Sequence, residues 1–287
     1  MLRADALATL YLFHPLRRLF PGRPGIPILM YHSISNREER THPYYRTVTT
    51  PEVFAQQMRF LHENGYSAVS VDEVVEILQG RRKITGRPVA ITFDDGFQDF
   101  YTNAFPVLSR FGFTATMYLA TGYIGRSPQS FMGVECMTWD QVRELRDASI
   151  HFGSHTVTHP QLRSLRNEDV QAELRRSKET IENKLGAPVS SFAYPYAFPE
   201  TDRAFIAMLR QLLLDSGYRS GASTMIGTAA NGQEALFLPR LPVNSGDDPH
   251  LLGAKLGGGY DWLHWIQYAA KLSADCSPGR SATHLTH

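Results

Sequence analysis

Short apolar segments of strand length alternate with amphipathic helical patterns along most of this 287-residue chain. This alternation is typical of parallel strands joined by crossover helices. The number of candidate strands is about that with which a parallel barrel closes. We therefore expect an α/β fold, a barrel of about seven or eight β/α units. The candidate strands cover residues 26–31, 67–71, 88–93, 114–120, 151–154, 189–194, 218–222 and 237–243.

Capping residues and glycines mark several of the intervening helices. Thr50-Pro51-Glu52 supplies an N-cap, a first-turn proline and an acid near the positive helix end. A helix that begins at Asn167 is expected to end at Gly186, and another is expected over 201–215. Residues 138–141 have the pattern of a capping box, which predicts a further helix start.

Two segments fall outside the alternation. Residues 122–137 contain glycine, serine and proline and are expected to form a long loop of the kind that covers a site. Residues 260–272 form an aromatic-rich helix candidate that we expect to pack on the barrel, because interfacial helices usually have a more basic polar face. The expected organisation is an N-terminal apolar and basic extension (1–25), the barrel (26–245), and a C-terminal aromatic helix with a flexible tail (246–287).

Composition and charge narrow the classes of partner. Hydrophobic residues make up 43% of the chain and charged residues 20%, so the chain can bury an ordinary core. With 29 basic and 28 acidic residues the net charge is +1, which gives no electrostatic argument for a nucleic-acid partner. The only cysteines, Cys136 and Cys276, are far apart and predict neither a disulfide framework nor a thiolate zinc site.

No export or membrane-spanning segment is predicted. Residues 6–13 are mostly apolar, but Asp5 precedes them and no small-residue cleavage site is visible. No apolar run reaches the roughly 18 residues needed to cross a bilayer. These observations favour a cytoplasmic location, and peripheral contact with a membrane stays open.

Side chains suited to acid–base or metal chemistry follow four of the predicted strands. Parallel strands all point the same way, so groups at their carboxyl ends are expected to converge on one rim, where ligands bind in such folds. The groups are Tyr31-His32 after the first strand, Asp94-Asp95-Gly96 after the third, His155 to His159 after the fifth, and Tyr194-Pro195-Tyr196 after the sixth.

One aspartate and two histidines without a sulfur ligand suit a borderline divalent metal, Zn²⁺ above all, in an open catalytic site. Pro160 disfavours helical geometry at His159, so we expect both imidazoles at a strand-to-loop corner. Alone, the histidine spacing could be a chance pair among 11 histidines, and the two acids could be an ordinary turn. Together at neighbouring strand ends they favour a metal site in which one carboxylate is a ligand and the other a general base.

These segments resemble the motifs of the polysaccharide deacetylases, carbohydrate esterase family 4. Residues 92–96, 154–159 and 194–196 are similar to the first three family motifs, in the same order, and the resemblance covers about residues 26–243. It implies a single catalytic domain that is a distorted (β/α)7–8 barrel. It also implies a metal-dependent hydrolase that removes N-acetyl groups from the amino sugars of a polysaccharide, in exopolysaccharide or cell-envelope metabolism, with release of acetate. The polymer and its linkage stay unspecified.

The resemblance also implies roles by position. Asp94 would be the general base, and Asp95, His155 and His159 would hold the metal. The backbone N–H of Tyr196 would stabilise an oxyanion. Residues expected around the substrate are Tyr194, Tyr196 and Arg240.

The histidine that protonates the leaving amine is expected near the start of the domain. Tyr31-His32 is similar to an arrangement in family members that act on exopolysaccharides, which makes His32 the expected general acid; the alternative is that His32 only orients a loop. No clear late Leu-x-His motif is present, and His250 is the nearest substitute.

Two positions depart from the family pattern. Ala193 stands where an arginine often pairs with the base, and Arg240 could replace that arginine or be merely structural. Ala197 stands where a glycine commonly follows the Pro-Tyr pair. Rival functions are O-deacetylation of ester-linked sugars, deacylation of a lipid-linked sugar, and carbohydrate binding without catalysis.

Overall fold

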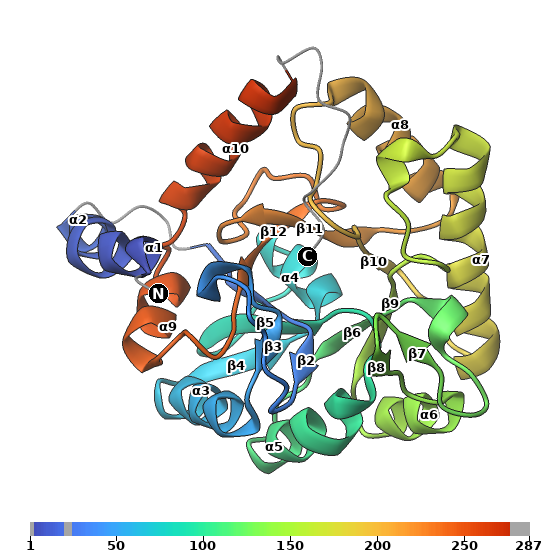
Figure 1. Ribbon diagram of the computed structural model, residues 1–287, viewed down its shortest axis with the longest axis horizontal. Helices are drawn as coiled ribbons and strands as arrows, with labels where there is room; N and C mark the ends of the chain where they lie inside the picture. Colours follow the sequence, from blue (N-terminus) through green and yellow to red (C-terminus); the bar gives the residue numbers. More distant parts are fainter. Residues whose placement is uncertain (1–2, 20–24, 276–287) are drawn as a thin grey trace.

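Seven parallel strands close into a barrel in the computed structural model of the protein, which describes residues 3–19 and 25–275 (Figure 1). The ring closes because β1 pairs in parallel with both β12 and β5. The expected (β/α) barrel is therefore confirmed. In order around the ring the strands are β1 (Ile28–Tyr31), β12 (Leu238–Pro242), β11 (Ser220–Ile226), β10 (Ser191–Ala193), β9 (His151–Ser154), β6 (Thr116–Leu119) and β5 (Arg87–Phe93).

An eighth parallel strand, β4 (Tyr66–Val69), pairs with the first half of β5 through residues 87–90 and lies outside the closed ring. The strand expected over 67–71 thus ends earlier than predicted. Ser70 leaves the strand because its side chain caps the next helix, α4 (Val71–Leu78), in a capping box with Glu73. A competing helix cap therefore ended the strand that the apolar run had suggested.

Helices follow most of the strands and cover the outside of the barrel (Figure 1). The expected caps are present: Thr50 caps α3, Thr138 and Gln141 form the capping box of α6, and α7 ends at Gly186 with φ +65°. Helix α8 begins at residue 203 rather than 201, because Asp202 accepts a hydrogen bond from the Phe205 N–H. The outer helices are α3 (Pro51–Glu63), α5 (Phe105–Arg110), α6 (Trp139–Asp147), α7 (Asn167–Leu185), α8 (Arg203–Asp215) and α9 (Pro249–Leu256).

Helix α4 is seen in the middle of the ring in Figure 1; it packs Val71, Val74 and Val75 into the inner cluster of the barrel and contacts residues at the start of β6, β10 and β11. Side chains alternate between the two faces of a strand, so Ala90 of β5 belongs to the inner cluster whereas Val89 and Ile91 belong to the larger outer core. The inner cluster consists of Ile26, Ile28, Val69, Val71, Val74, Val75, Ala90, Tyr118, Ala193, Ala222, Ala229 and Leu238. Helix α4 therefore covers the amino end of the barrel and leaves the carboxyl ends of the strands for ligand chemistry.

The chain also forms two terminal helical segments. The N-terminal segment consists of α1 (Ala4–Ala8), a π-helical turn (Thr9–Phe13) and α2 (His14–Leu19), and the C-terminal one is α10 (Trp262–Asp275). In the described ranges, no helix is long and apolar enough to cross a membrane. The tail from residue 276, expected to be flexible, lies outside the described residues.

Candidate active site

Asp94 continues the inward-facing series of β5, which places its carboxylate inside the barrel at 2% exposure. Its backbone N–H donates to the carbonyl of Tyr31, so the parallel pairing with β1 extends one residue past the strand. Asp95 and Gly96 then turn the chain with φ values of +75° and +80°. A β-carbon on Gly96 would lie 2.9 Å from the side-chain end of Ile124 and 3.0 Å from that of Leu119, so both the φ and the space at this turn favour glycine.

Arg240 forms a buried two-point ion pair with Asp94. Its Nη1 donates to Oδ1 at 2.7 Å and its Nη2 donates to Oδ2 at 2.8 Å. The remaining contacts hold the guanidinium in place: Nε donates to the carbonyl of Ser223 at 2.9 Å, and Nη1 also reaches Thr92 Oγ1. Arg240 thus takes the place beside the candidate base that Ala193 leaves without a cation. With these contacts made, its geometry supports positioning of Asp94 rather than the substrate contact expected from sequence.

The charge of Arg240 decides the ionisation of Asp94. Burial alone would raise the pKa of Asp94, but the guanidinium lowers it below its ordinary value. Asp94 is therefore a fixed carboxylate at neutral pH. For Asp95, burial and then the charge of Asp94 raise the pKa well above 3.8, because no cation lies in contact with it among the described residues.

Asp95, His155 and His159 converge on one buried point and form the candidate metal centre. The Nε2 atoms of the two histidines are 3.1 Å apart, and they lie 3.6 and 3.5 Å from Asp95 Oδ1. That oxygen is buried and has no hydrogen-bond partner in the described part of the chain. These three residues also form the group whose donor atoms could hold one metal ion.

The donor set fits a tetrahedral ion. Ligands at about 2.0–2.2 Å from one Zn²⁺ lie about 3.3–3.6 Å from each other, close to the observed separations. Burial lowers the pKa of His155 to about 4 and that of His159 to about 3, so both imidazoles are neutral near pH 7 and can offer a lone pair. A cation here would also neutralise the orphaned carboxylate of Asp95.

Contacts behind the two histidines fix their orientation. His155 Nδ1 lies 2.8 Å from the carbonyl of Ala193, which leaves Nε2 facing the donor group. Glu173 of α7 accepts hydrogen bonds from the N–H groups of Val157 and Thr158 and from the Thr158 hydroxyl, and so anchors the turn that separates the histidines. Glu173 was not predicted; its place beside Val170 and Leu174 on the helix was the only sequence signal.

The backbone at the site is held in conformations that side chains usually avoid. Four of the six non-glycine residues with positive φ among those described belong to it: Asp95, Thr156 (+69°), His159 (+54°) and Tyr196 (+59°). Such positions persist only where surrounding contacts impose them, and they concentrate at functional sites. The strand-to-loop corner expected at His155 to His159 is therefore present, in place of a helix.

His32 and Tyr196 lie at the edge of the same site. His32 Nε2 is 3.8 Å from Asp94 Oδ2, and its side chain is 22% exposed. Burial lowers the pKa of His32, while the charge of Asp94 opposes that shift. The Tyr196 ring packs 4.5 Å from that of His159 between centroids, and its backbone N–H has no acceptor among the described residues.

Tyr194 and His250 lie elsewhere. Tyr194 is 3% exposed and packs edge-on against Phe198 and Phe205, which does not support the substrate contact expected from its motif. His250 is exposed in the first turn of α9, and no contact joins it to the site residues. Of the two histidines considered for the acid, His32 is the one beside Asp94.

The loop expected over 122–137 covers one side of the metal-ligand group. It forms a short hairpin of β7 (Ser130–Phe131) and β8 (Val134–Glu135), and Phe131 packs against His159 at 5.1 Å and Tyr123 at 4.3 Å between ring centroids. After β1 and His32 the chain continues into β2 (Ser33–Ile34), which pairs in parallel with β3 (Val48–Thr49). Phe131 and Tyr196 therefore flank His159 as an aromatic wall.

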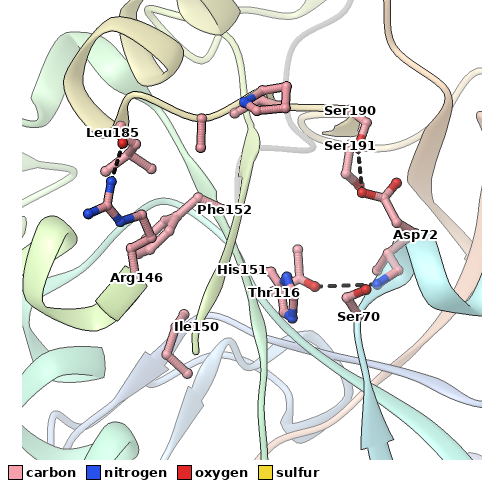
Figure 2. A pocket seen from close by; sticks show the side chains of 14 residues that line it. Ser70, Asp72, Thr116, Arg146, Ile150, His151, Phe152, Leu185, Ser190 and Ser191 are labelled. Atoms are coloured by element: carbon pink, nitrogen blue, oxygen red, sulfur yellow. Dashed lines mark hydrogen bonds between the residues drawn. The ribbon is translucent and has the colours of Figure 1, made fainter. Parts of the chain in front are cut away.

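A separate pocket of about 150 Å³ lies at the other end of the barrel, among residues that begin β6, β9 and β10 (Figure 2). Its acidic group is already satisfied, since Asp72 accepts hydrogen bonds from the hydroxyls of Ser190 and Ser220. Thr116 likewise accepts from the Val71 N–H. In parallel barrels this end serves stability, so the pocket is not the candidate active site.

Known proteins with similar sequences support a family assignment. Residues 81–217 match the polysaccharide deacetylase family, a range that holds Asp94, Asp95, both metal-facing histidines and Tyr196 but neither His32 nor Arg240. YxkH of Bacillus subtilis (strain 168), which bears the polysaccharide deacetylase name, is 30% identical over 229 residues, 80% of this chain and 75% of YxkH. The poly-beta-1,6-N-acetyl-D-glucosamine N-deacetylase of Escherichia coli (strain K12) is 30% identical over 141 residues, 46% of this chain but only 20% of that protein.

Solved structures agree in fold. The Streptococcus pyogenes deacetylase PplD, in complex with acetate, matches 81% of this chain and 98% of its own with 26% identity and a TM-score of 0.71. IcaB from Ammonifex degensii matches 81% and 97% with 24% identity and a TM-score of 0.69. Together with the relation to YxkH over three-quarters of that protein, these findings show that the chain belongs to the polysaccharide deacetylase family.

Proposed function

We propose that this protein is a metal-dependent hydrolase that removes N-acetyl groups from the amino sugars of an exopolysaccharide and releases acetate. The proposal rests on the different environments of two adjacent acids. Asp94 is ion-paired to Arg240, whereas Asp95 faces two neutral histidines. A protein that only bound sugar would have no evident need for a second, fixed carboxylate beside a metal-ligand group.

The substrate class is supported by the relatives. The Escherichia coli relative is named for N-deacetylation of poly-beta-1,6-N-acetyl-D-glucosamine. PplD was solved in complex with acetate, which is the product expected here. A β-linked N-acetylglucosamine polymer is therefore the first substrate to test.

Asp95, His155 and His159 would hold the divalent ion, and Zn²⁺ suits this donor set. When bound, such an ion polarises an amide carbonyl and makes a bound water more acidic. Asp94 would accept the proton of the attacking water. Because Arg240 fixes both of its oxygens, Asp94 contributes position more than intrinsic basicity.

Two groups would complete the reaction on the sugar side. The backbone N–H of Tyr196 would donate to the oxygen that becomes negative when the amide carbonyl is attacked. His32 would deliver a proton to the departing amine, and its Nε2 lies 3.8 Å from Oδ2 of Asp94. One short proton transfer would therefore restore both groups after each turnover.

The proposal is tested by metal quantification combined with acetate release. The panel contains β-1,6- and β-1,4-linked N-acetylglucosamine oligomers, an O-acetylated sugar ester and a lipid-linked N-acetyl sugar. Asp94→Asn should keep the metal and lose acetate release by about 10²- to 10⁴-fold, whereas Asp95→Asn should lose the metal as well. Full activity of metal-loaded Asp94→Asn would overturn the assignment of the base, and preference for the ester would overturn N-deacetylation.

The general acid is tested with a matched pair of histidine variants. His32→Gln should lower kcat by about 10²-fold or more without loss of metal. His62→Gln, on the outer helix α3 beside Phe111, should leave kcat unchanged. Equal effects of the two substitutions would contradict the role of His32.

A further inference from the structure

The two terminal helical segments expose mainly apolar side chains, unlike most surface helices of globular proteins. In residues 3–19 every described side chain that is exposed is apolar: Ala4, Leu7, Tyr11, Leu12, Pro15, Leu16 and Leu19. They recur at intervals of three or four residues and so lie along one side of the helical segment. A helix packed on a core normally exposes its polar side instead.

Helix α10 also exposes mainly apolar side chains. Its exposed residues are Trp265, Ile266, Ala269, Ala270, Leu272 and Ser273, again along one side of the helix. Its other side packs on the protein, where Leu263 is 7% exposed. The predicted packing of this helix on the barrel therefore accounts for one of its faces and leaves the other uncovered.

The two segments contact each other. The rings of Phe13 and Trp262 stack at 4.4 Å, and the Trp262 indole N–H donates to Thr9. In Figure 1, α1, α2 and α10 lie along the same side of the barrel. We call their exposed apolar faces together the terminal apolar surface; it comprises Leu7, Tyr11, Leu12, Leu16, Leu19, Trp265, Ile266 and Leu272.

Most of the large hydrophobic side chains that the protein exposes lie on this surface. Among the described residues twelve large hydrophobic side chains are exposed, and eight of them belong to the terminal apolar surface. Tyr11 is 78% exposed, Leu19 73% and Trp265 72%. Exposed apolar patches of this kind mark interaction sites.

Positive charge gathers in the N-terminal segment. Residues 1–25 contain four arginines and one aspartate, and residues 262–287 contain one lysine, one arginine and one aspartate. Residues 26–261 keep 23 basic and 26 acidic residues, so the central chain is net negative, whereas the N-terminal segment is net positive even with Arg3 paired to Asp5 and Asp247. Helix α10 holds one lysine and one aspartate and is neutral, and its Lys271 is paired with Glu200. Tyr11 among leucines and arginines gives the N-terminal segment the composition of an interfacial helix, to which α10 adds apolar side chains rather than charge.

From these observations we infer that the terminal apolar surface docks on an anionic lipid bilayer. A symmetric contact with a second copy would bring two positive N-terminal segments together, whereas anionic headgroups complement them. The inference does not depend on the reaction that the protein catalyses.

Docking would bring the candidate site close to the membrane. Glu200, in the segment that follows Tyr196, accepts a hydrogen bond from Lys271 of α10 at 2.7 Å and lies 3.6 Å from His264. Gln267 of the same helix donates to the hydroxyl of Tyr44, in the segment that joins β2 to β3. Helix α10 thus bridges two segments at the carboxyl end of the barrel, and a polymer at the lipid surface would meet the site there.

The test is co-sedimentation of the full chain with vesicles of phosphatidylglycerol and phosphatidylcholine in equal parts, against vesicles of phosphatidylcholine alone. The wild-type chain should bind the anionic vesicles, more weakly at high salt. Tyr11→Glu and Trp265→Glu should each weaken binding by at least about tenfold, while keeping the circular dichroism and the acetate release from soluble oligomers of the wild type. The matched control Leu214→Glu, exposed to 41% on α8, should bind as the wild type does.

Three results would overturn the inference. The wild-type chain could fail to bind the anionic vesicles, or the two surface variants could bind as well as Leu214→Glu. The chain could also sediment as a dimer that Trp265→Glu dissociates, in the absence of vesicle binding, which would assign the surface to a second copy.

Discussion

Arg240 and Asp94 form a two-point ion pair inside the barrel, although 146 residues separate them in the chain. Arg240 lies in β12 and Asp94 directly follows β5, and these are the two strands that flank β1. Arg240 is 1% and Asp94 2% exposed, so neither charge is compensated by water. The pair both keeps Asp94 ionised and fixes the direction of its oxygens.

Arg240→Met should therefore damage activity and stability together. Acetate release should fall by at least about hundredfold because the base loses its position. The free energy of unfolding should fall by about 3–5 kcal/mol because a buried carboxylate is left without its partner. Urea denaturation and acetate assays measure the two effects.

The double variant Arg240→Met/Asp94→Asn provides the control. Without the buried charge it should regain part of the lost stability but no activity. If Arg240→Met alone were as stable and as active as the wild type, the ion pair would have no part in the site.

Much of this site could be predicted from the sequence because strand ends converge in a parallel barrel. Asp95, His155 and His159 needed only the strand bounds and the ordered motifs. Arg240 could be identified as a candidate, but its pairing depends on the closure of β12 against β1, which no local pattern encodes. Arg240 stands two residues after Leu238 on β12, so both side chains point to the same face of the strand, and Leu238 belongs to the inner cluster.

Other features depended on tertiary contacts and could not be predicted. The substrate role expected for Tyr194 is not supported, because the ring turned toward Phe198 and Phe205 instead of the site. Glu173 stabilises the histidine turn from a different element, at a distance in sequence that no motif spans. The bounds of β4 depended on whether Ser70 continued a strand or capped a helix, and the capping box with Glu73 decided it.

Metal binding should release a proton from Asp95 and from no histidine. Burial and the charge of Asp94 raise the pKa of Asp95 above 3.8, so the metal-free protein holds a proton there over a wider acid range. The pKa values of His155 and His159 are about 4 and 3, so neither carries a proton that must leave at pH 5. Apparent Zn²⁺ affinity should therefore increase with pH until Asp95 is ionised, and then level off.

Calorimetric titration with Zn²⁺ at about pH 5, in buffers of different ionisation enthalpy, counts the released protons at a pH where zinc-bound water stays protonated. We expect at most one proton from the wild type and none from Asp95→Asn, which should also bind Zn²⁺ more weakly. A release of two or more protons would mean that the histidines are charged in the metal-free protein.

Gly96→Ala should disturb Asp94 and Asp95 in two ways: the new methyl group would crowd its neighbours, and alanine disfavours the left-handed backbone conformation at this position. The new methyl group would lie 2.9 Å from Ile124 and 3.0 Å from Leu119, at a φ of +80°. Gly65→Ala is the matched control, because its φ is +70° and no atom lies within 4 Å of the new methyl group. The control should lose about 1–2 kcal/mol of unfolding free energy from the left-handed conformation alone.

Gly96→Ala should lose more stability than the control and should also lower kcat, because the crowded turn carries Asp94 and Asp95. Thermal or urea denaturation together with acetate assays compares the two variants. Equal losses of stability with unchanged kcat would show that Ile124 and Leu119 move aside without displacing the acids.

Lys255→Met should destabilise the fold without direct effect on the chemistry. Lys255 is 1% exposed and lies 2.9 Å from Asp247, which is fully buried and also contacts Arg3 of the N-terminal segment. Removal of the ammonium leaves part of the Asp247 charge uncompensated, so the free energy of unfolding should fall by about 3 kcal/mol.

The control variant Arg175→Met breaks an exposed pair with Glu179 on α7 and should lower the free energy of unfolding by less than about 1 kcal/mol. Urea denaturation at neutral pH compares the two variants; equal losses would show that Arg3 alone compensates Asp247 and that Lys255 is dispensable to the buried ion cluster.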